Sequence, residues 1–320
     1  MENLFITGGS GTIGTAFIKK YRKKYRIFSF ARSEKAQIAL KRNFPEIEIL
    51  FGSVDNKIEL NNAIINAKPK FLIHAAALKH VDTAEKHPSL AIKSNILGSL
   101  NIIESAINNN IKVSVGISTD KACSPDNIYG QSKYLMEKIF QEYDNKKNRF
   151  VCCRFGNVAW SNGSVLPYWL KLAKENKPLP VTGKEMSRLI FNSLDAADLI
   201  FNAIKLSSKE KQFFILSKKM KKAFMYKLAN LISKKNKFIE LRSGEVLHED
   251  LISEKEIQFT RELKNQLLIV TPNKKVLKKN RIDGPLSSLN AIEMTEEEMI
   301  NLIKNVYKDG NLNLIKVQNY

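Results

Sequence analysis

A glycine-rich turn near the N-terminus constrains the fold more than any other stretch of the sequence. It reads Thr7-Gly-Gly-Ser-Gly-Thr-Ile-Gly14, between a short apolar run that ends at Ile6 and a helical pattern that continues to Tyr25. Glycines in this pattern allow a tight turn, close approach of the backbone to a pyrophosphate, and close packing of helix on sheet. A helix that begins here directs free N–H groups at the phosphates. Because a strand precedes the turn and a helix follows it, we predict a dinucleotide site that contains Gly8, Gly11, Thr12, Ile13 and Gly14.

The residues after the second predicted strand indicate which dinucleotide binds. That strand ends at Phe30 and is followed by Ala31, Arg32 and Ser33. A site specific for NAD carries an acidic residue here, which bonds the ribose hydroxyls. An arginine instead suits a 2′-phosphate, through its charge and its bidentate geometry. We therefore predict that Arg32 and Ser33 bind NADP rather than NAD; in the alternative, Arg32 is solvated and Glu34 takes the place of the acid.

Strands and helices alternate regularly in the first half of the chain. After the first two strands, helical patterns separate further apolar runs at 47–51, 71–74, 112–117 and 150–154. Repeated βα units with nearly continuous apolar strands are typical of a parallel sheet covered on both faces. The fold class predicted is therefore α/β, a Rossmann-type doubly wound parallel sheet. Ligands of such sheets gather at the carboxyl ends of the strands.

The pattern changes after Arg154, and a smaller mixed α/β lobe is expected on the C-terminal side. Its predicted elements are helices at 166–174, 193–206, 223–233 and 295–307 and a strand at 212–216. We expect residues 1–165 to form the dinucleotide-binding domain and residues 166–320 to form mostly a substrate lobe. Segments at roughly 190–216 are expected to return to the first domain.

Reactive side chains are densest in the segment Ile117–Lys133. It contains a hydroxyl, a carboxylate, two ammonium groups and a phenol, which belong to Thr119, Asp120, Lys121, Lys133 and Tyr129. If a helix starts near Tyr129, then Tyr129 and Lys133 share one face of it. A lysine beside a tyrosine lowers the pKa of the phenol, as a base needs near neutral pH. In the alternative the segment is a loop followed by a surface helix.

Composition and charge argue against several other classes of protein. The net charge is +20, but the lysine-rich runs are dispersed and are not interleaved with aromatic residues, so we expect no nucleic-acid partner. No apolar run has the length of a membrane span and no leader precedes the first strand, so we expect a cytoplasmic protein without stable membrane insertion. The three cysteines and four histidines have no metal-ligand spacing, so we expect no metal.

Several segments taken together resemble the extended short-chain dehydrogenase/reductases: TGGSGTIG, HAAALKHV, STDKA, YGQSK and RFGNV. More narrowly, the chain resembles nucleotide-sugar 4,6-dehydratases that act on UDP-N-acetylglucosamine. The similarity covers almost the full length and includes the segments 181–188 and 242–249. A tyrosine at position 129 without a membrane segment resembles the short, C5-inverting type of the pseudaminic acid pathway. Three residues depart from the pattern: Ser53, Trp160 and Val246.

The resemblance implies an NADP-dependent hydro-lyase that forms a UDP-2-acetamido-2,6-dideoxy-hexos-4-ulose for surface polysaccharide or flagellin glycan. Tyr129, tuned by Lys133, would take the O4 proton as hydride leaves C4, and Thr119 would bond O4. Asp120 is implied as the acid that protonates the departing O6 hydroxyl, and Lys121 as the base at C5. A neutral lysine requires burial or a nearby positive charge that depresses its pKa. The alternatives are a UDP-N-acetylhexosamine 4-epimerase, a 5,6-dehydratase, and a non-enzymatic NADP-binding protein.

Further contacts are expected from residues outside this segment. Adenine contact is expected to shift from Ser53 to Asp55 or a backbone amide, and Asn95 to organise water near Lys133. The other cofactor residues expected are Ala75, Ala76 and Lys79. The substrate residues expected are Lys79, Asn157, Arg188, Arg242 and Glu245. The resemblance also implies a homo-oligomer, a dimer or a larger assembly up to a hexamer, formed through helices of the nucleotide lobe.

Overall fold

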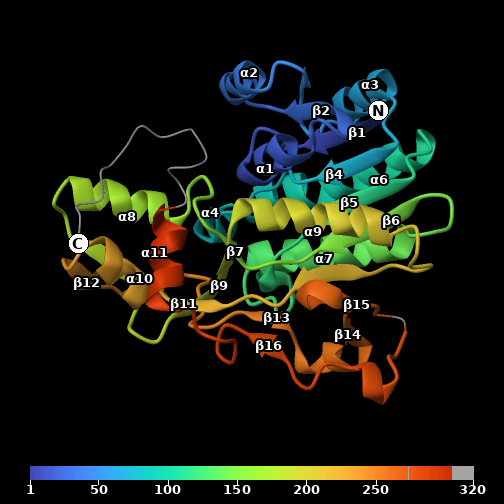
Figure 1. The fold of residues 1–320 in the computed structure, drawn as a ribbon. Coiled ribbons are helices and arrows are strands. Elements are labelled where there is room, and N and C mark those ends of the chain that lie inside the picture. Colours follow the sequence, from blue (N-terminus) through green and yellow to red (C-terminus); the bar gives the residue numbers. More distant parts are fainter. Residues whose placement is uncertain (273, 305–320) are drawn as a thin grey trace.

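The structure is a computed structural model that describes residues 1–272 and 274–304, and its centre is a nine-stranded sheet (Figure 1). In spatial order the strands are β14-β15-β10-β6-β5-β4-β1-β2-β3. Their bounds are β1 Glu2–Thr7, β2 Tyr25–Ala31, β3 Glu48–Phe51, β4 Phe71–His74, β5 Val113–Ile117, β6 Arg149–Cys153, β10 Ile215–Lys218, β14 Thr260–Glu262 and β15 Leu267–Val270.

Seven neighbouring strands, from β3 to β10, are paired in parallel. β15 is antiparallel to β10, and β14 is antiparallel to β15. The chain builds outward from β1 in one direction through β2 and β3, and then in the other direction from β4. This reversal is the point at which a doubly wound sheet binds its ligand. The predicted α/β class and parallel sheet are confirmed.

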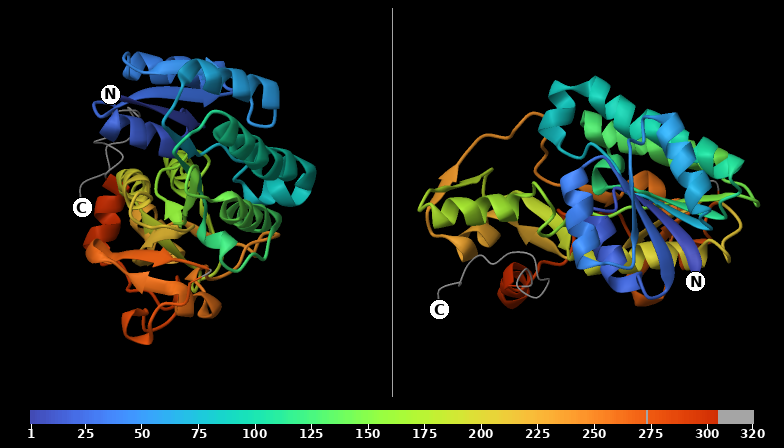
Figure 2. Two further views of the ribbon diagram at one scale, coloured as in Figure 1. Left: turned by 90° about the vertical axis from the view of Figure 1, so that its right-hand side faces the viewer. Right: turned by 90° about the horizontal axis from the view of Figure 1, so that it is seen from above.

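Helices cover both faces of this sheet (Figure 2). On one face α1 (Thr12–Tyr21) packs against α9 (Ser193–Leu206), and α2 (Glu34–Asn43) adds Leu40 to the same core. On the other face lie α3 (Lys57–Ala67), α6 (Gly98–Asn108) and α7 (Ile128–Tyr143). Alternation along β1 sends Leu4 and Ile6 to the first core and Phe5 to the second. Three short helices, α4 (Val81–Lys86), α5 (Pro88–Ala91) and the π-helix Ile92–Leu97, lead into α6.

A smaller lobe, with three short sheets, gathers to one side of the main sheet (Figure 1). The first has the order β11-β9-β7, and the other two pair β12 with β8 and β13 with β16. The bounds are β7 Asn157–Val158, β8 Leu179–Val181, β9 Ser187–Phe191, β11 Lys222–Phe224, β12 Asn236–Phe238, β13 Asp250–Ile252, β16 Leu286–Ser287, α8 Val165–Lys174, α10 Met225–Ile232 and α11 Glu296–Lys304. A core around Trp169 and Leu228 joins α8, α10 and α11.

Several predicted boundaries differ from those observed. The first helix ends at Tyr21, because Tyr25 already begins β2, and the predicted helix from Ala223 begins at Met225, after β11. The antiparallel strands β14 and β15 were not predicted, because their runs are too short for periodicity to show. Of the helix predicted at 295–307, residues 305–307 lie outside the described residues. No helix within the described part of the chain has both the length and the apolar character needed to cross a membrane.

Candidate active site

The glycine turn has the close backbone approach that a dinucleotide site requires. Gly8 has φ +70°, and a Cβ there would lie 2.8 Å from the amide nitrogen of Ala76, at the end of β4. A Cβ at Gly14 would lie 2.5 Å from Cα of Gly9, so this glycine lets α1 pack on the turn. Gly11 is the N-cap of α1 and offers no capping side chain, which leaves the first helical N–H groups for an anion. These residues therefore fit a dinucleotide pyrophosphate.

A cavity of about 730 Å³ extends from this turn to the smaller lobe, within the usual size of a ligand site. Most of the predicted site residues line it: Gly8, Gly11, Thr12, Ile13, Arg32, Ser33, Ala75, Ala76, Lys79, Thr119, Lys121, Tyr129, Lys133, Asn157, Arg188, Arg242 and Glu245. Four of the predicted residues do not line the cavity: Gly14, Asp55, Asn95 and Asp120. The single cavity therefore joins the predicted cofactor residues to the predicted substrate residues.

Two of these residues, Asp55 and Asn95, contact neighbours that line the cavity. Asp55 accepts a hydrogen bond from the hydroxyl of Ser53, which itself lines the cavity. The adenine contact expected of Asp55 stays a prediction. Asn95 is fully buried in the π-helix. Its amide bonds the backbone N–H and C=O of Leu78 and the hydroxyl of Ser132, so it reaches Lys133 only through the preceding residue.

The reactive segment is held in place by both flanking strands and a helix cap. The backbone N–H of Asp120 donates to the carbonyl of Phe155, at 3.0 Å. Asn127 caps α7 by accepting from the N–H of Gly130, at 2.8 Å, so the helix begins at Ile128. Tyr129 and Lys133 consequently lie one turn apart, and both line the cavity. Position 130 has no room for a side chain, because a Cβ there would lie 2.2 Å from the carbonyl oxygen of Lys121.

The protonation of Tyr129 differs from the prediction. Burial raises its pKa, and the charge of Asp120 raises it further, although hydrogen bonding with Thr119 acts in the opposite direction. Burial also lowers the pKa of Lys133 to about 8, and its Nζ lies 3.3 Å from Sδ of Met136. The predicted lowering of the phenol pKa by Lys133 is therefore wrong for this structure, because burial penalises the charged form of both groups.

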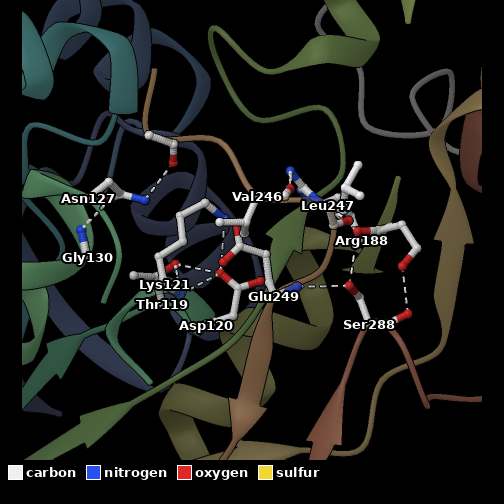
Figure 3. Close-up of polar contacts among 12 residues, drawn as sticks. Thr119, Asp120, Lys121, Asn127, Gly130, Arg188, Val246, Leu247, Glu249 and Ser288 are labelled. Atoms are coloured by element: carbon white, nitrogen blue, oxygen red, sulfur yellow. Dashed lines mark hydrogen bonds and ion pairs between the residues drawn. The ribbon is translucent and has the colours of Figure 1, made fainter. Parts of the chain in front are cut away.

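Lys121 lies between two carboxylates, as Figure 3 shows. Its Nζ is 3.2 Å from Oδ1 of Asp120 and 3.1 Å from Oε1 of Glu249. Burial lowers the pKa of Lys121, but the charges of Asp120 and Glu249 outweigh burial and leave this pKa raised. The expectation of a depressed lysine pKa is therefore wrong, because the sequence did not reveal the second carboxylate.

Asp120 is fully buried and only half of its carboxylate is bonded. Oδ1 accepts from the Thr119 hydroxyl and from the backbone N–H of Lys121, each at 2.9 Å. Oδ2 is buried without a hydrogen-bond partner. A Cβ at Gly156, which lines the cavity, would lie 3.1 Å from this oxygen. Oδ2 is thus the atom of Asp120 with capacity for a proton.

Glu249 is the functional residue that the sequence reasoning missed. It lines the cavity, although its side chain is only 5% exposed. Burial raises its pKa and Asp120 adds to this, while Lys121 and Arg188 act against it. The residue ends the segment 242–249, whose similarity to the dehydratases was the one available signal.

The predicted substrate residues are partly occupied by the protein itself. Arg188 donates from Nη1 to the carbonyls of Ser187 and Leu247 and from Nη2 to that of Val246. Arg242 is exposed and pairs with Glu245, with Nε 3.4 Å from Oε1.

Lys79 belongs to the same predicted set and also contacts the protein. Its Nζ donates to the carbonyl of Asn162, at 2.6 Å, and the N–H of Asn162 donates to the hydroxyl of Thr12. The loop that contains Asn162 therefore connects the smaller lobe to the glycine turn. Asn157 lies on β7 and lines the cavity without such an engagement among the described residues.

The sequence matches a known protein family. A family model described as polysaccharide biosynthesis protein matches residues 4–271. The chain belongs to this family. The chain is also similar to a UDP-N-acetylglucosamine 4,6-dehydratase (inverting) of Campylobacter jejuni, to which it is 35% identical over 290 residues, covering 87% of this chain and 86% of that protein.

Two further proteins are similar to the chain. A UDP-glucose 4-epimerase of Rickettsia bellii is 34% identical over 279 residues, covering 82% of this chain and 81% of that protein. The crystal structure of Pen from Bacillus thuringiensis superposes with a TM-score of 0.87 at 30% identity, covering 96% of this chain and 98% of that chain. The similarity to extended short-chain dehydrogenase/reductases expected from the motifs is confirmed.

Proposed function

We propose that the protein is a nicotinamide-dependent UDP-N-acetylglucosamine 4,6-dehydratase, a hydro-lyase that inverts C5. The observation that carries this proposal is the position of Lys121, between two buried carboxylates in the cavity that Tyr129 and Lys133 also line. A redox pair alone suits an oxidation at C4. An ammonium–carboxylate cluster beside it adds the proton transfers that an elimination across C5 and C6 requires. The Campylobacter jejuni relative carries the name of this activity.

Each step of the mechanism falls to a residue of the cavity. A nicotinamide held by the glycine turn would supply the hydride chemistry at C4 and C6. Tyr129 takes the O4 proton, which requires its phenolate form. The Thr119 hydroxyl lies beside it to orient O4, and its hydrogen bond acts to lower the pKa of the phenol. Lys121 removes the C5 proton, which the C4 ketone makes acidic. Asp120 protonates the departing O6 hydroxyl through Oδ2, the oxygen that has no other partner.

The cofactor is proposed to be NADP rather than NAD. Arg32 is exposed at the carboxyl end of β2 and lines the cavity, where a 2′-phosphate would meet its guanidinium. Ser33 also lines the cavity, but its hydroxyl already caps α2. Release of the bound nucleotide by denaturation, followed by mass spectrometry, distinguishes the two cofactors by the extra phosphate.

The wider setting of the enzyme is also a proposal. Arg188, Arg242 and Lys79 supply positive charge for a UDP diphosphate at the smaller lobe. Exposed apolar side chains gather on the π-helix, α6 and α7: Leu97, Leu100, Tyr134 and Leu135. We propose that this face forms a homo-oligomer, a dimer or larger, of a cytoplasmic enzyme in the synthesis of surface polysaccharide or flagellin glycan of the pseudaminic acid type.

One experiment tests the reaction against its main rival. A UDP-sugar 4-epimerase shares the fold, Tyr129 and Lys133, and the Rickettsia bellii relative carries that name. We expect UDP-N-acetylglucosamine in deuterium oxide to yield a 4-keto-6-deoxy sugar with deuterium at C5, which NMR detects. UDP-N-acetylgalactosamine as the only product would identify an epimerase, and a 5,6-unsaturated product would identify a 5,6-dehydratase.

A further inference from the structure

Glu249 is a buried carboxylate of the cavity that the mechanism above does not use. Its Oε1 lies 3.1 Å from Nζ of Lys121, which also contacts Asp120 (Figure 3). The Lys121 side chain is only 15% exposed and that of Asp120 is not exposed at all. A single ammonium group is thus enclosed by two carboxylates, where Coulomb interactions are strong and protons are readily redistributed.

The backbone around Glu249 is fixed by a pair of serines. The N–H of Glu249 donates to the Ser288 hydroxyl at 3.0 Å, and the N–H of Ser288 returns a bond to the Glu249 carbonyl at 2.9 Å. Ser288 and Ser187 then exchange hydroxyl-to-carbonyl bonds at 3.0 and 2.6 Å. Because Ser187 lies on β9, next to Arg188, this arrangement holds the carboxylate in a defined position relative to the substrate lobe.

The charged groups that face Glu249 are Lys121, Asp120 and Arg188. Arg188 directs its Nη1 and Nη2 donors at three backbone carbonyls, and its guanidinium has no acceptor site. Asp120 has Oδ1 occupied by Thr119 and Lys121, and Oδ2 is assigned to O6. Glu249 is therefore the group with capacity to exchange a proton with Lys121.

We propose that Glu249 accepts a proton from Lys121 once the sugar fills the cavity, so that Lys121 meets the C5 hydrogen as a neutral amine. Glu249 is thus a positioning and proton-accepting partner of the base, and the inference rests on the dehydratase function proposed above. Exclusion of water favours the uncharged pair over the ion pair. The raised pKa of Glu249 favours this transfer, whereas the charges of the two carboxylates raise the pKa of Lys121 and oppose it, so the transfer depends on the exclusion of water by the bound sugar.

The proton balance of the elimination closes from a starting state with the Lys121 ammonium, the Glu249 carboxylate and a proton on Asp120. First, an N–H bond of Lys121 breaks and an O–H bond forms on Glu249. Next the C5–H bond breaks and a new N–H bond forms on Lys121, while the electron pair at C5 expels O6, which leaves as water with the proton of Asp120. Transfer of the proton held by Glu249 through Lys121 to Asp120 then restores the cluster. C5 regains a proton later, from solvent, and solvent receives in exchange the O4 proton that Tyr129 took up.

Glu249→Gln tests the inference, since an amide oxygen still bonds the ammonium but does not take its proton. We expect product formation to fall by about 10²- to 10⁴-fold, the usual effect of losing a proton-transfer group. Oxidation at C4, seen as reduced nicotinamide absorbance in a single turnover, is expected to persist. The acid limb of the kcat/KM pH profile, set by ionisation of Glu249, is expected to vanish, so that the rate rises with pH until Lys121 titrates.

Two further variants and the wild type complete the test. Glu249→Asp is expected to retain the acid limb at a rate between the other two, and it keeps the inference testable if the glutamine variant does not fold. Glu262→Gln is the matched control, because Glu262 forms an exposed ion pair with Lys219 at 2.6 Å, and we expect no change.

The outcomes separate the inference from the function on which it rests. A wild-type rate in Glu249→Gln, or a reduced rate with an unchanged pH profile, overturns the proton transfer but leaves the dehydratase intact. A wild-type protein that forms no 4-keto-6-deoxy sugar overturns the proposed function itself.

Discussion

The structure contains two ion clusters that each pair one cation with two carboxylates, one around Arg154 and one around Lys121. In the first, Arg154 donates from Nε and Nη2 to Glu137, at 3.0 and 2.6 Å, and from Nη1 to Glu256 at 2.9 Å. The hydroxyl of Ser118 adds a bond to Glu137 at 2.6 Å. This Arg154 cluster is closed, and none of its three charged members lines the cavity, although Ser118 does.

The Lys121 cluster differs in access and in completeness. Lys121 and Glu249 line the cavity, and Oδ2 of Asp120 is left without a partner. A fully bonded guanidinium never releases its proton, whereas a lysine between two carboxylates can. Both clusters bury charge, so burial does not distinguish them. The type of cation and the unfilled hydrogen bonds distinguish the cluster proposed for proton transfer from the one that contributes stability.

The largest effect is expected for the open cluster. Lys121→Ala removes the base, so we expect product formation to fall by on the order of 10³-fold or more. The protein is expected to fold and to retain its nucleotide, because the glycine turn is untouched. The measurement is product NMR together with nucleotide content. Lys219→Ala, from the exposed pair with Glu262, is the control, and full product formation by Lys121→Ala would refute the assigned base.

A substitution in the Arg154 cluster is expected to lower the stability of the fold instead. Arg154→Met leaves Glu137 and Glu256 buried without their cation, which typically lowers the free energy of unfolding by about 3–5 kcal/mol. Urea denaturation followed by circular dichroism measures this loss. Arg261→Met is the control, because its partly exposed pair with Glu210 is expected to contribute about 1 kcal/mol or less. Equal losses for the two variants would show that the cluster is not the structural element described here.

The smallest effect concerns Lys133, which lies beside Glu137 of the closed cluster. Burial lowers its pKa from an ordinary value of 10.5 to about 8 in the folded protein. Between these values the unfolded chain holds a proton that the folded protein has released, so this group makes stability rise with pH. We expect Lys133→Met to remove a rise on the order of 1 kcal/mol per pH unit.

Urea denaturation of the wild type and the variant across this range gives the difference curve. Lys138→Met, an exposed change on the same helix, serves as the control. Parallel curves for the wild type and Lys133→Met would show that Lys133 does not release its proton in this window.

Local pattern allowed prediction of the first half of the fold and of the residues that lie close in sequence. The strand–glycine turn–helix unit and the position of Tyr129 and Lys133 on one helix face follow from spacing alone. The partner of Lys121 did not, because Glu249 reaches it from a distant segment whose position depends on the Ser187–Ser288 contact. For the same reason the predicted protonation of Lys121 was wrong.

Other parts of the fold were not predicted because their strands are short, and not because their partners are distant in sequence. β14 and β15 are short runs that add to the far edge of the sheet, and periodicity does not distinguish such runs from loops. The carboxylate of Asp55 accepts a hydrogen bond from Ser53, and its expected contact with adenine stays a prediction. The division at residues 165 and 166 and the role of each site residue stay predictions.

Asn127 has a consequence for any attempt to recombine this enzyme with its relatives. The same side chain caps α7 through Oδ1 and donates from Nδ2 to the carbonyl of Gly244, at 2.9 Å. Gly244 in turn packs against Asn127 and Val81 with no room for a Cβ. A chimera that exchanges sugar specificity therefore has to inherit the segments 117–133 and 242–249 from one parent, however far apart its crossover points lie in the gene.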